Sequence, residues 1–258
     1  MWAPCVGVAM LAAQCMLYVC FAYLMPKGPW RDEPGYTAHQ VLSLPLMIYL
    51  STVGGLAWFH SPKESVAERV LGVDDTGQHI AALMMWVQLL WNIPMCCLVR
   101  SLREDRLMLL HHVGMAAVAG VMQLPLYAYY ANFFIGFSEL SSIPLVFVDL
   151  HRTEHRKWKR YIDSNDCFSR SLGICRAAFI LGFVVIRVVY FPYVMARDAR
   201  GVYETRILFD GPLLLYSSVP LAGALFCLLQ WYWMCKILVM MHQHCRQPPA
   251  TPDAVTLV

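Results

Sequence analysis

Continuous apolar runs, separated by short polar segments, dominate this chain. Each run is close to the roughly 20 residues that an α-helix needs to cross about 30 Å of hydrocarbon. Transmembrane β-strands would instead alternate apolar and polar positions. The pattern therefore predicts an all-α integral membrane protein of about seven transmembrane helices. The predicted helices cover residues 1–25, 41–59, 79–99, 107–124, 126–148, 172–195 and 212–235.

The polar segments between these runs are expected to be loops. Pro125 marks the tightest of them, a turn that leaves almost no loop between the fourth and fifth helices. We divide the chain into an N-terminal helix with its connection (1–39), a six-helix domain (40–240) and a short tail (241–258), disordered from Gln247. The other expected loops are residues 27–39, 61–78, 100–106, 149–170 and 196–211.

The basic residues divide unequally between the two sets of loops that seven helices create. The loops at 26–39, 100–106 and 149–171, together with the segment from Lys236, hold thirteen Lys and Arg, and the other set holds five. Loops rich in Lys and Arg stay on the cytosolic side. We therefore expect a cytosolic C-terminus, and protection of a C-terminal tag from protease in sealed microsomes would contradict this topology.

Composition agrees with a membrane protein and excludes several other classes. Hydrophobic residues make up 59% of the chain and charged residues 14%, whereas a soluble domain carries about a quarter charged residues. The net charge of +3 does not indicate nucleic-acid binding. The ten cysteines include no CxxC pair, so a disulfide framework is not expected. A metal site is not expected from the adjacent His111 and His112, because ligands on one helix would be spaced i and i+4.

Several polar and ionisable side chains lie within the predicted helices, where their cost in hydrocarbon indicates a function by default. Glu139 and Arg176 are expected to pair in the interior and so to lower each other's desolvation cost. The spacing of polar and small residues predicts three helix faces that line a shared interior. These faces are Asn132–Gly136–Glu139–Ser142, Arg176–Ile180–Phe183–Arg187 and His112–Ala116–Ala119–Gln123.

Structural roles remain open for the same residues. A Glu–Arg pair also locks two helices together, and paired histidines also occur at helix starts near the interface. Asn132 and Ser142 also suit hydrogen bonds between helices. Adjacent residues on a helix point about 100° apart, so at most one of His111 and His112 faces the centre of a cavity. The basic segment 151–160 suits an ordinary cytosolic flank, and it also suits anionic lipid headgroups or a coenzyme A ester.

Three segments together resemble the TLC-domain family, named for the TRAM, LAG and CLN proteins. They are LLHHVG (109–114), YYANFFIG (129–136) and SELSSIPLVFVDL (138–150), and Arg176 in the following helix also fits the family pattern. The resemblance covers about residues 40–240. It implies six helices around a membrane cavity, with one extra N-terminal helix, and a location in the endoplasmic reticulum or another endomembrane.

The family includes the ceramide synthases, which transfer an acyl chain from acyl-CoA to the amine of a long-chain base. Resemblance to them implies His111 and His112 as catalytic groups. Their acidic HD…SD set is not present here, because the segment reads S-E-L-S-S with Glu139 as its single acid. The chain is therefore more similar to divergent TLC proteins linked to lipid composition or lipid handling than to true ceramide synthases.

Three functions follow as hypotheses. The first is a protein that binds or handles a membrane lipid and influences lipid composition or trafficking. The second is a lipid acyltransferase with acyl-CoA as co-substrate, in which an imidazole attacks the thioester or acts as general base. The third, less supported, is a seven-helix receptor. No cofactor is expected, and the oligomeric state stays open.

The candidate catalytic residues are His111, His112 and Glu139, and the candidate substrate-binding residues are Asn132, Ser138, Ser142, Arg176 and Arg187.

Overall fold

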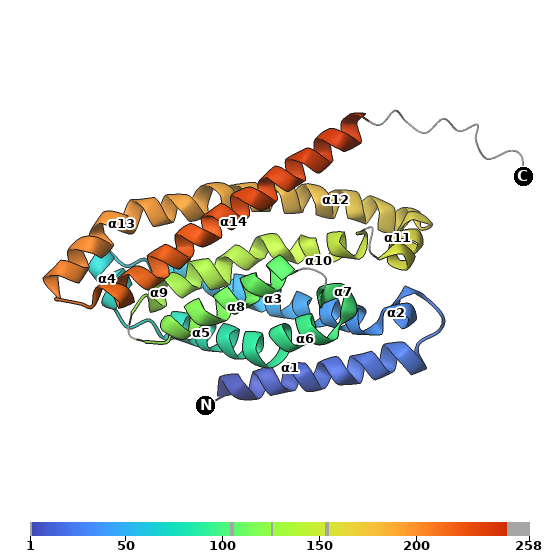
Figure 1. The fold of residues 1–258 in the computed structure, drawn as a ribbon, viewed down its shortest axis with the longest axis horizontal. Coiled ribbons are helices and arrows are strands. Elements are labelled where there is room, and N and C mark those ends of the chain that lie inside the picture. Colours follow the sequence, from blue (N-terminus) through green and yellow to red (C-terminus); the bar gives the residue numbers. More distant parts are fainter. Residues whose placement is uncertain (1, 104–105, 125, 153–154, 247–258) are drawn as a thin grey trace, which may run out of the picture.

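The computed structural model describes residues 2–103, 106–124, 126–152 and 155–246, which form a bundle of long helices (Figure 1). No strand occurs in these ranges, and six of their helices are long and apolar enough to cross a membrane. The prediction of an all-α integral membrane protein is thereby confirmed. The six are α1 (Trp2–Val19) with η1 (Cys20–Leu24); α3 (Pro34–His60); α5 (Asp75–Val87) with η2 (Gln88–Asn92) and α6 (Ile93–Leu98); α9 (Ala128–Ala131) with η3 (Asn132–Gly136), η4 (Phe137–Ser141) and α10 (Ser142–Leu150); α12 (Asp166–Gly182) with η5 (Phe183–Tyr190) and α13 (Phe191–Leu208); and α14 (Leu213–Arg246).

The remaining predicted helix is shorter than expected. It forms α8 (Arg106–Val121), whose 16 residues span about 24 Å. Four short helices cover the ends of the bundle. They are α2 (Pro29–Asp32), α4 (Val66–Leu71), α7 (Arg100–Arg103) and α11 (Arg156–Asp163).

All five segments predicted as loops contain helix. The segment 61–78 contains α4 and the start of α5, the segment 100–106 contains α7, and the segment 149–170 contains α11 and the start of α12. The connection at 27–39 contains α2 and the start of α3, where Pro34 occupies a first-turn position that suits its fixed φ. The segment 196–211 continues α13 as far as Leu208. Its polar residues are helical because Asp198, 3% exposed, pairs with Arg69 of α4 at 3.1 Å, while Arg200 and Glu204 pair on the outer face.

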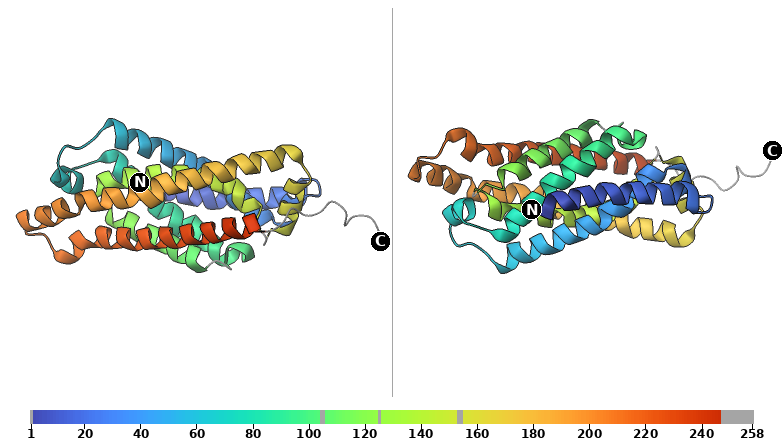
Figure 2. Two further views of the ribbon diagram at one scale, coloured as in Figure 1. Left: turned by 90° about the horizontal axis from the view of Figure 1, so that it is seen from above. Right: turned by 90° about the horizontal axis from the view of Figure 1, so that it is seen from below.

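The connections sort to two opposite ends of the bundle (Figures 1 and 2). One end carries the α1–α2 connection, α7, α11 and the end of α14, and the other carries α4, the start of α5 and the α13–α14 turn. The N-terminus lies at the second end. This arrangement matches the two predicted loop sets, and the assignment of the first end to the cytosol rests on its excess of Lys and Arg.

Residues 122–127 connect α8 to α9, and Pro125, which was predicted to mark the turn, lies outside the described residues. Tyr127 adopts a left-handed conformation with φ 64°, which is strained for a bulky side chain. Two hydrogen bonds hold it: its backbone N–H donates to the Val70 carbonyl at 2.7 Å, and its hydroxyl donates to the Tyr216 carbonyl at 2.5 Å. Burial raises the pKa of this hydroxyl, which therefore stays a donor.

The helix 128–150 lies at the centre of the bundle, and its first nine residues are all buried. Close backbone contacts position it. A Cβ on Gly54 would lie 2.4 Å from the Asn132 carbonyl oxygen and 2.7 Å from the Gly136 Cα, and a Cβ on Gly77 would lie 1.9 Å from the Ala128 carbonyl oxygen. Small residues allow membrane helices to approach this closely. These contacts with α3 and α5 thus fix the position of the central helix along the bundle axis and its rotation about its own axis.

We predict that Gly54→Ala destabilises the bundle by about 1–3 kcal/mol, because the new methyl group meets backbone that cannot move aside. Gly173→Ala is the matched control, since a Cβ there has no atom within 4 Å. It should be neutral or stabilising by up to about 1 kcal/mol through helix propensity. Thermal unfolding of both variants in detergent checks this, and equal melting temperatures would contradict the close contact at Gly54.

Candidate functional site

A buried arginine organises the polar interior of the bundle. Arg187, 7% exposed, donates from Nε to the Ser141 hydroxyl at 2.8 Å. Its Nη2 donates to a carboxylate oxygen of Glu139 at 3.2 Å and to the Ser142 hydroxyl at 2.9 Å. All three acceptors are themselves buried. The arrangement satisfies an ion pair that would otherwise be costly in a low-dielectric interior.

Irregular helical turns bring these groups together. η3 is a π-helical turn and η4 a 3-10 turn, so the winding of the central helix changes at Gly136, immediately before Glu139. η5, which carries Arg187, is also π-helical. Such turns rotate the following side chains relative to a regular helix, and they are frequent at functional sites.

The predicted pair between Glu139 and Arg176 does not form. Arg176 is exposed, and its Nη2 lies 2.9 Å from Nδ1 of His151. Nε2 of the same ring lies 2.6 Å from the Asp163 carboxylate. Because arginine only donates, Nδ1 of His151 accepts and Nε2 donates to the carboxylate. Arg176 therefore belongs to a network at the end of the bundle. Arg187, eleven residues further along the chain, is the arginine that pairs with Glu139 in the interior.

One histidine of the pair reaches the interior, as their angular separation predicts. His111 lines a small cavity that Glu139 and Arg187 also line. Its ring packs edge-on against Phe226 and Trp233 of α14, with centroids 5.4 and 5.5 Å away. Its buried Nδ1 has no hydrogen-bond partner within the described part of the chain. His112 lies beside it, with ring centroids 5.6 Å apart, and does not line this cavity.

The residues of α8 that line the cavity are therefore shifted by one position from the predicted face. The cavity is lined by His111, Met115, Val118 and Met122. The predicted face that starts at His112 turns toward α5 instead, where Gln123 Nε2 donates to the Met85 sulfur at 2.9 Å.

The residues of the predicted face of the central helix also point in different directions, because the helix contains irregular turns. Asn132, fully buried, donates to the Asp74 carboxylate at 2.9 Å, and Asp74 also caps the start of α5 by accepting from the Gly77 N–H at 2.6 Å. Ser138 donates to the carbonyl of Phe134 in its own helix at 2.9 Å. Neither Asn132 nor Ser138 lines the cavity, whereas Glu139 does.

Several residues of this site are not predicted from the sequence. Ser141 makes the shortest contact to Arg187, and an ideal helix would turn it away from Glu139. Gln230 of α14, 3% exposed, lines the cavity, and its side-chain oxygen has no hydrogen-bond partner among the described residues. The sequence signal for Gln230 is a polar amide side chain within an otherwise apolar segment. The apolar wall includes three methionines, Met115, Met122 and Met195.

In this conformation the cavity has room for about one water molecule. Its volume of about 20 Å³ is close to that of one water molecule, so a larger ligand requires the surrounding helices to separate. Methionine walls are adaptable and favour such rearrangement. Within the described ranges, no group of three or more His, Cys, Asp or Glu side chains is arranged to hold a metal ion.

Comparison with protein families identifies the chain. A family model described as the TLC domain matches residues 37–239. The chain belongs to the TLC-domain family. Comparison with curated proteins and with solved structures gives no match. Membership agrees with a multi-pass membrane protein of a lipid-related family, and it favours the two lipid hypotheses over a seven-helix receptor.

We predict that Arg187→Gln strongly destabilises this TLC protein, by about 3–5 kcal/mol, because it leaves the buried Glu139 without its partner. Arg176→Gln removes the same charge from the same continuous helix at an exposed position, and it should cost no more than about 1 kcal/mol. Thermal unfolding in detergent compares the two. A larger loss for Arg176→Gln would contradict the assignment of Arg187 as the interior partner.

Proposed function

We propose that this TLC-domain protein binds a membrane lipid in the cavity between α8, η4, η5 and α14, and thereby influences the lipid composition or trafficking of its membrane. The endoplasmic reticulum or another endomembrane is the proposed location. The observation that carries the proposal is the convergence of a hydrogen-bonded Arg187–Glu139 pair with His111 and Gln230 at an otherwise apolar cavity. Lipid and small-molecule sites combine apolar walls with a few such polar groups.

Two buried polar atoms in this cavity support a ligand. Nδ1 of His111 and the side-chain oxygen of Gln230 both lack a hydrogen-bond partner among the described residues. A buried polar group without a partner costs about 1–3 kcal/mol. A lipid hydroxyl, amide or ester group placed there would satisfy one or both of them, while its chain contacts the methionine and phenylalanine walls.

Entry of a lipid requires α14 to move relative to α8 and α13. The contact between α14 and α13 is close at Gly223, where a Cβ would lie 2.6 Å from the terminal methyl of Met195. This methionine has three rotatable bonds and can withdraw without backbone movement. We therefore place the gate of the cavity at Gly223 and Met195.

Acyl transfer is the second candidate, favoured by the available nitrogen of His111. In that reaction the neutral imidazole attacks the thioester carbonyl of acyl-CoA, and the coenzyme A thiolate leaves. The acyl-imidazolium then passes its acyl group to a lipid hydroxyl or amine, whose proton is released to the coenzyme A thiolate or to water as the neutral imidazole is restored. Glu139 accepts its one side-chain hydrogen bond from Arg187 in the described structure and does not orient His111, so lipid binding without turnover is the better supported function.

Mass spectrometry of the intact, detergent-purified protein tests both candidates. We expect a co-purifying lipid whose occupancy falls about tenfold in Gly223→Leu, because the larger side chain drives Met195 into the cavity. Ala224→Leu is the control, since this neighbouring residue is exposed. Folded wild-type protein without any bound lipid, or equal occupancy in the two variants, would contradict the proposal.

The same measurement after incubation with acyl-CoA separates binding from catalysis. Lipid binding alone predicts no change in protein mass. A gain of one acyl chain that disappears in His111→Ala and persists in His112→Ala would establish the transferase in its place.

A further inference from the structure

A short basic helix, α11, lies at the end of the bundle that also carries α2 and α7 (Figures 1 and 2). Its sequence, RKWKRYID, places four cations within five residues. α2 follows the first membrane span, which ends at Leu24, and α11 precedes the span that begins at Asp166. α11 therefore lies where two membrane spans end.

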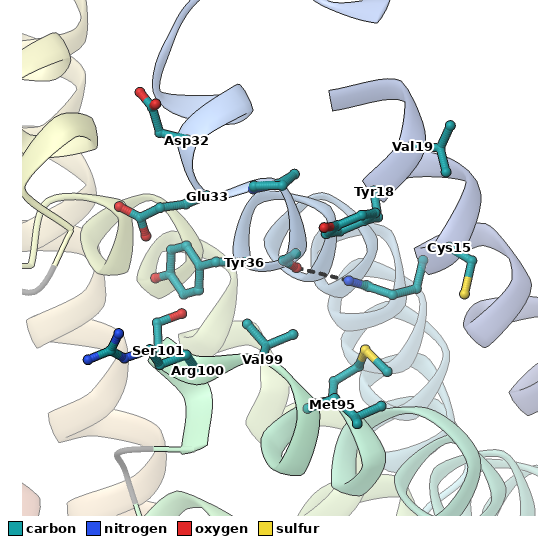
Figure 3. A pocket seen from close by; sticks show the side chains of 14 residues that line it. Cys15, Tyr18, Val19, Asp32, Glu33, Tyr36, Met95, Val99, Arg100 and Ser101 are labelled. Carbon is teal, nitrogen blue, oxygen red and sulfur yellow. Dashed lines mark hydrogen bonds between the residues drawn. The ribbon is translucent and has the colours of Figure 1, made fainter. Parts of the chain in front are cut away.

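One face of α11 is fixed to the α2–α3 junction. Figure 3 shows Asp32, Glu33 and Tyr36 at this junction, where they also line a cavity of about 780 Å³ beside α1. Asp32 pairs with Lys157 at 2.6 Å, and Glu33 pairs with His155. The ring of Tyr36 stacks on that of His155, with centroids 3.7 Å apart. Both carboxylates of the junction are thus engaged by α11.

The outward face of α11 carries the cations that remain. His155 and Ile162, 3% and 1% exposed, mark its buried face. Arg156 and Arg160 are exposed one turn apart, with the half-buried Lys159 beside them, and none of these three side chains makes a hydrogen bond or ion pair with the described residues. Like charges four residues apart on a helix repel each other, so a bound anion would relieve this face of α11.

The nearby acids do not neutralise this face. The Asp163 carboxylate lies 2.6 Å from Nε2 of His151, whose other ring nitrogen accepts from Arg176. Asp166 and Arg170 are exposed one turn apart on α12, where their charges offset each other. The outward face of α11 therefore keeps its positive charge.

An aromatic cluster sets the level of α11 in the membrane. The Trp30 ring of α2 lies edge-on to Trp158 and Tyr161 of α11, with centroids 6.2 and 5.6 Å away. Phe168 of α12, 38% exposed, lies 5.8 Å from Tyr161. Trp and Tyr gather at the boundary between membrane and water. Their place between α2 and α11 puts the cations of α11 at the depth of lipid headgroups.

We propose that the outward face of α11, formed by Arg156, Lys159 and Arg160, binds the headgroups of anionic phospholipids in the leaflet at this end of the bundle. Basic clusters next to a membrane span attract anionic lipids in this way. A zwitterionic headgroup would bring a further cation to a face that has only cations. This site is separate from the interior cavity, so the inference goes beyond the proposed function.

Native mass spectrometry of the delipidated full-length protein, titrated separately with phosphatidylserine and phosphatidylcholine of identical acyl chains, tests this proposal. We expect phosphatidylserine to bind about tenfold more tightly. Arg156→Gln combined with Arg160→Gln should remove this preference and leave the melting temperature unchanged, because both side chains are exposed. Arg103→Gln combined with Arg106→Gln is the matched control. It also removes two exposed arginines, from α7 and the start of α8, and should keep the preference.

Arg156→Lys combined with Arg160→Lys keeps the charge and should keep the preference to within about threefold. Loss of preference in this lysine pair, equal binding of the two lipids by the wild type, or equal losses in the two glutamine pairs would overturn the proposal. Displacement of phosphatidylserine by an equal concentration of free coenzyme A would also overturn it, because the face would then serve a soluble phosphate ligand. None of these results depends on the interior cavity, which Gly223→Leu tests by itself.

Discussion

The charge of Arg187 is the constraint that the membrane part of this protein must satisfy. An arginine in the hydrocarbon interior is costly unless its donors find acceptors. Here the acceptors are Ser141, Glu139 and Ser142, all within or directly after one 3-10 turn. That turn keeps its position because Gly54 and Gly136 let α3 lie directly against the central helix. Helix packing and the polar site therefore depend on each other.

The two cavities differ in size and in the parts of the chain that form them. The interior cavity is small, and His111 and Gln230 lie beside the ion pair there. The cavity beside α1 is larger and is lined by exposed apolar residues of α1 and α6. The N-terminal helix is held to the domain by Gln14, which donates to the Gly35 carbonyl at 2.9 Å and accepts from Trp91 at 3.2 Å. These two hydrogen bonds hold α1 against the family domain.

The transmembrane helices and most of the interior polar residues could be predicted from the sequence, but the partners of those polar residues could not. Apolar runs of membrane length and intramembrane charges are local signals, so His111, Glu139 and Arg187 could be selected individually. Which arginine meets Glu139 depends on the π-helical and 3-10 turns, and no residue pattern predicted these turns. The segment 196–208 was mistaken for a loop because its helix is stabilised by a distant partner, Arg69 on α4.

A double-mutant cycle on Glu139→Gln and Arg187→Gln tests the central claim most directly, because it measures the coupling between the two side chains. If the pair organises the interior, the double variant should melt in detergent above the less stable single variant, since the second change removes the charge that the first change left buried without a partner. Melting-temperature losses that add up in the double variant would show that the two residues act independently, and would contradict this account.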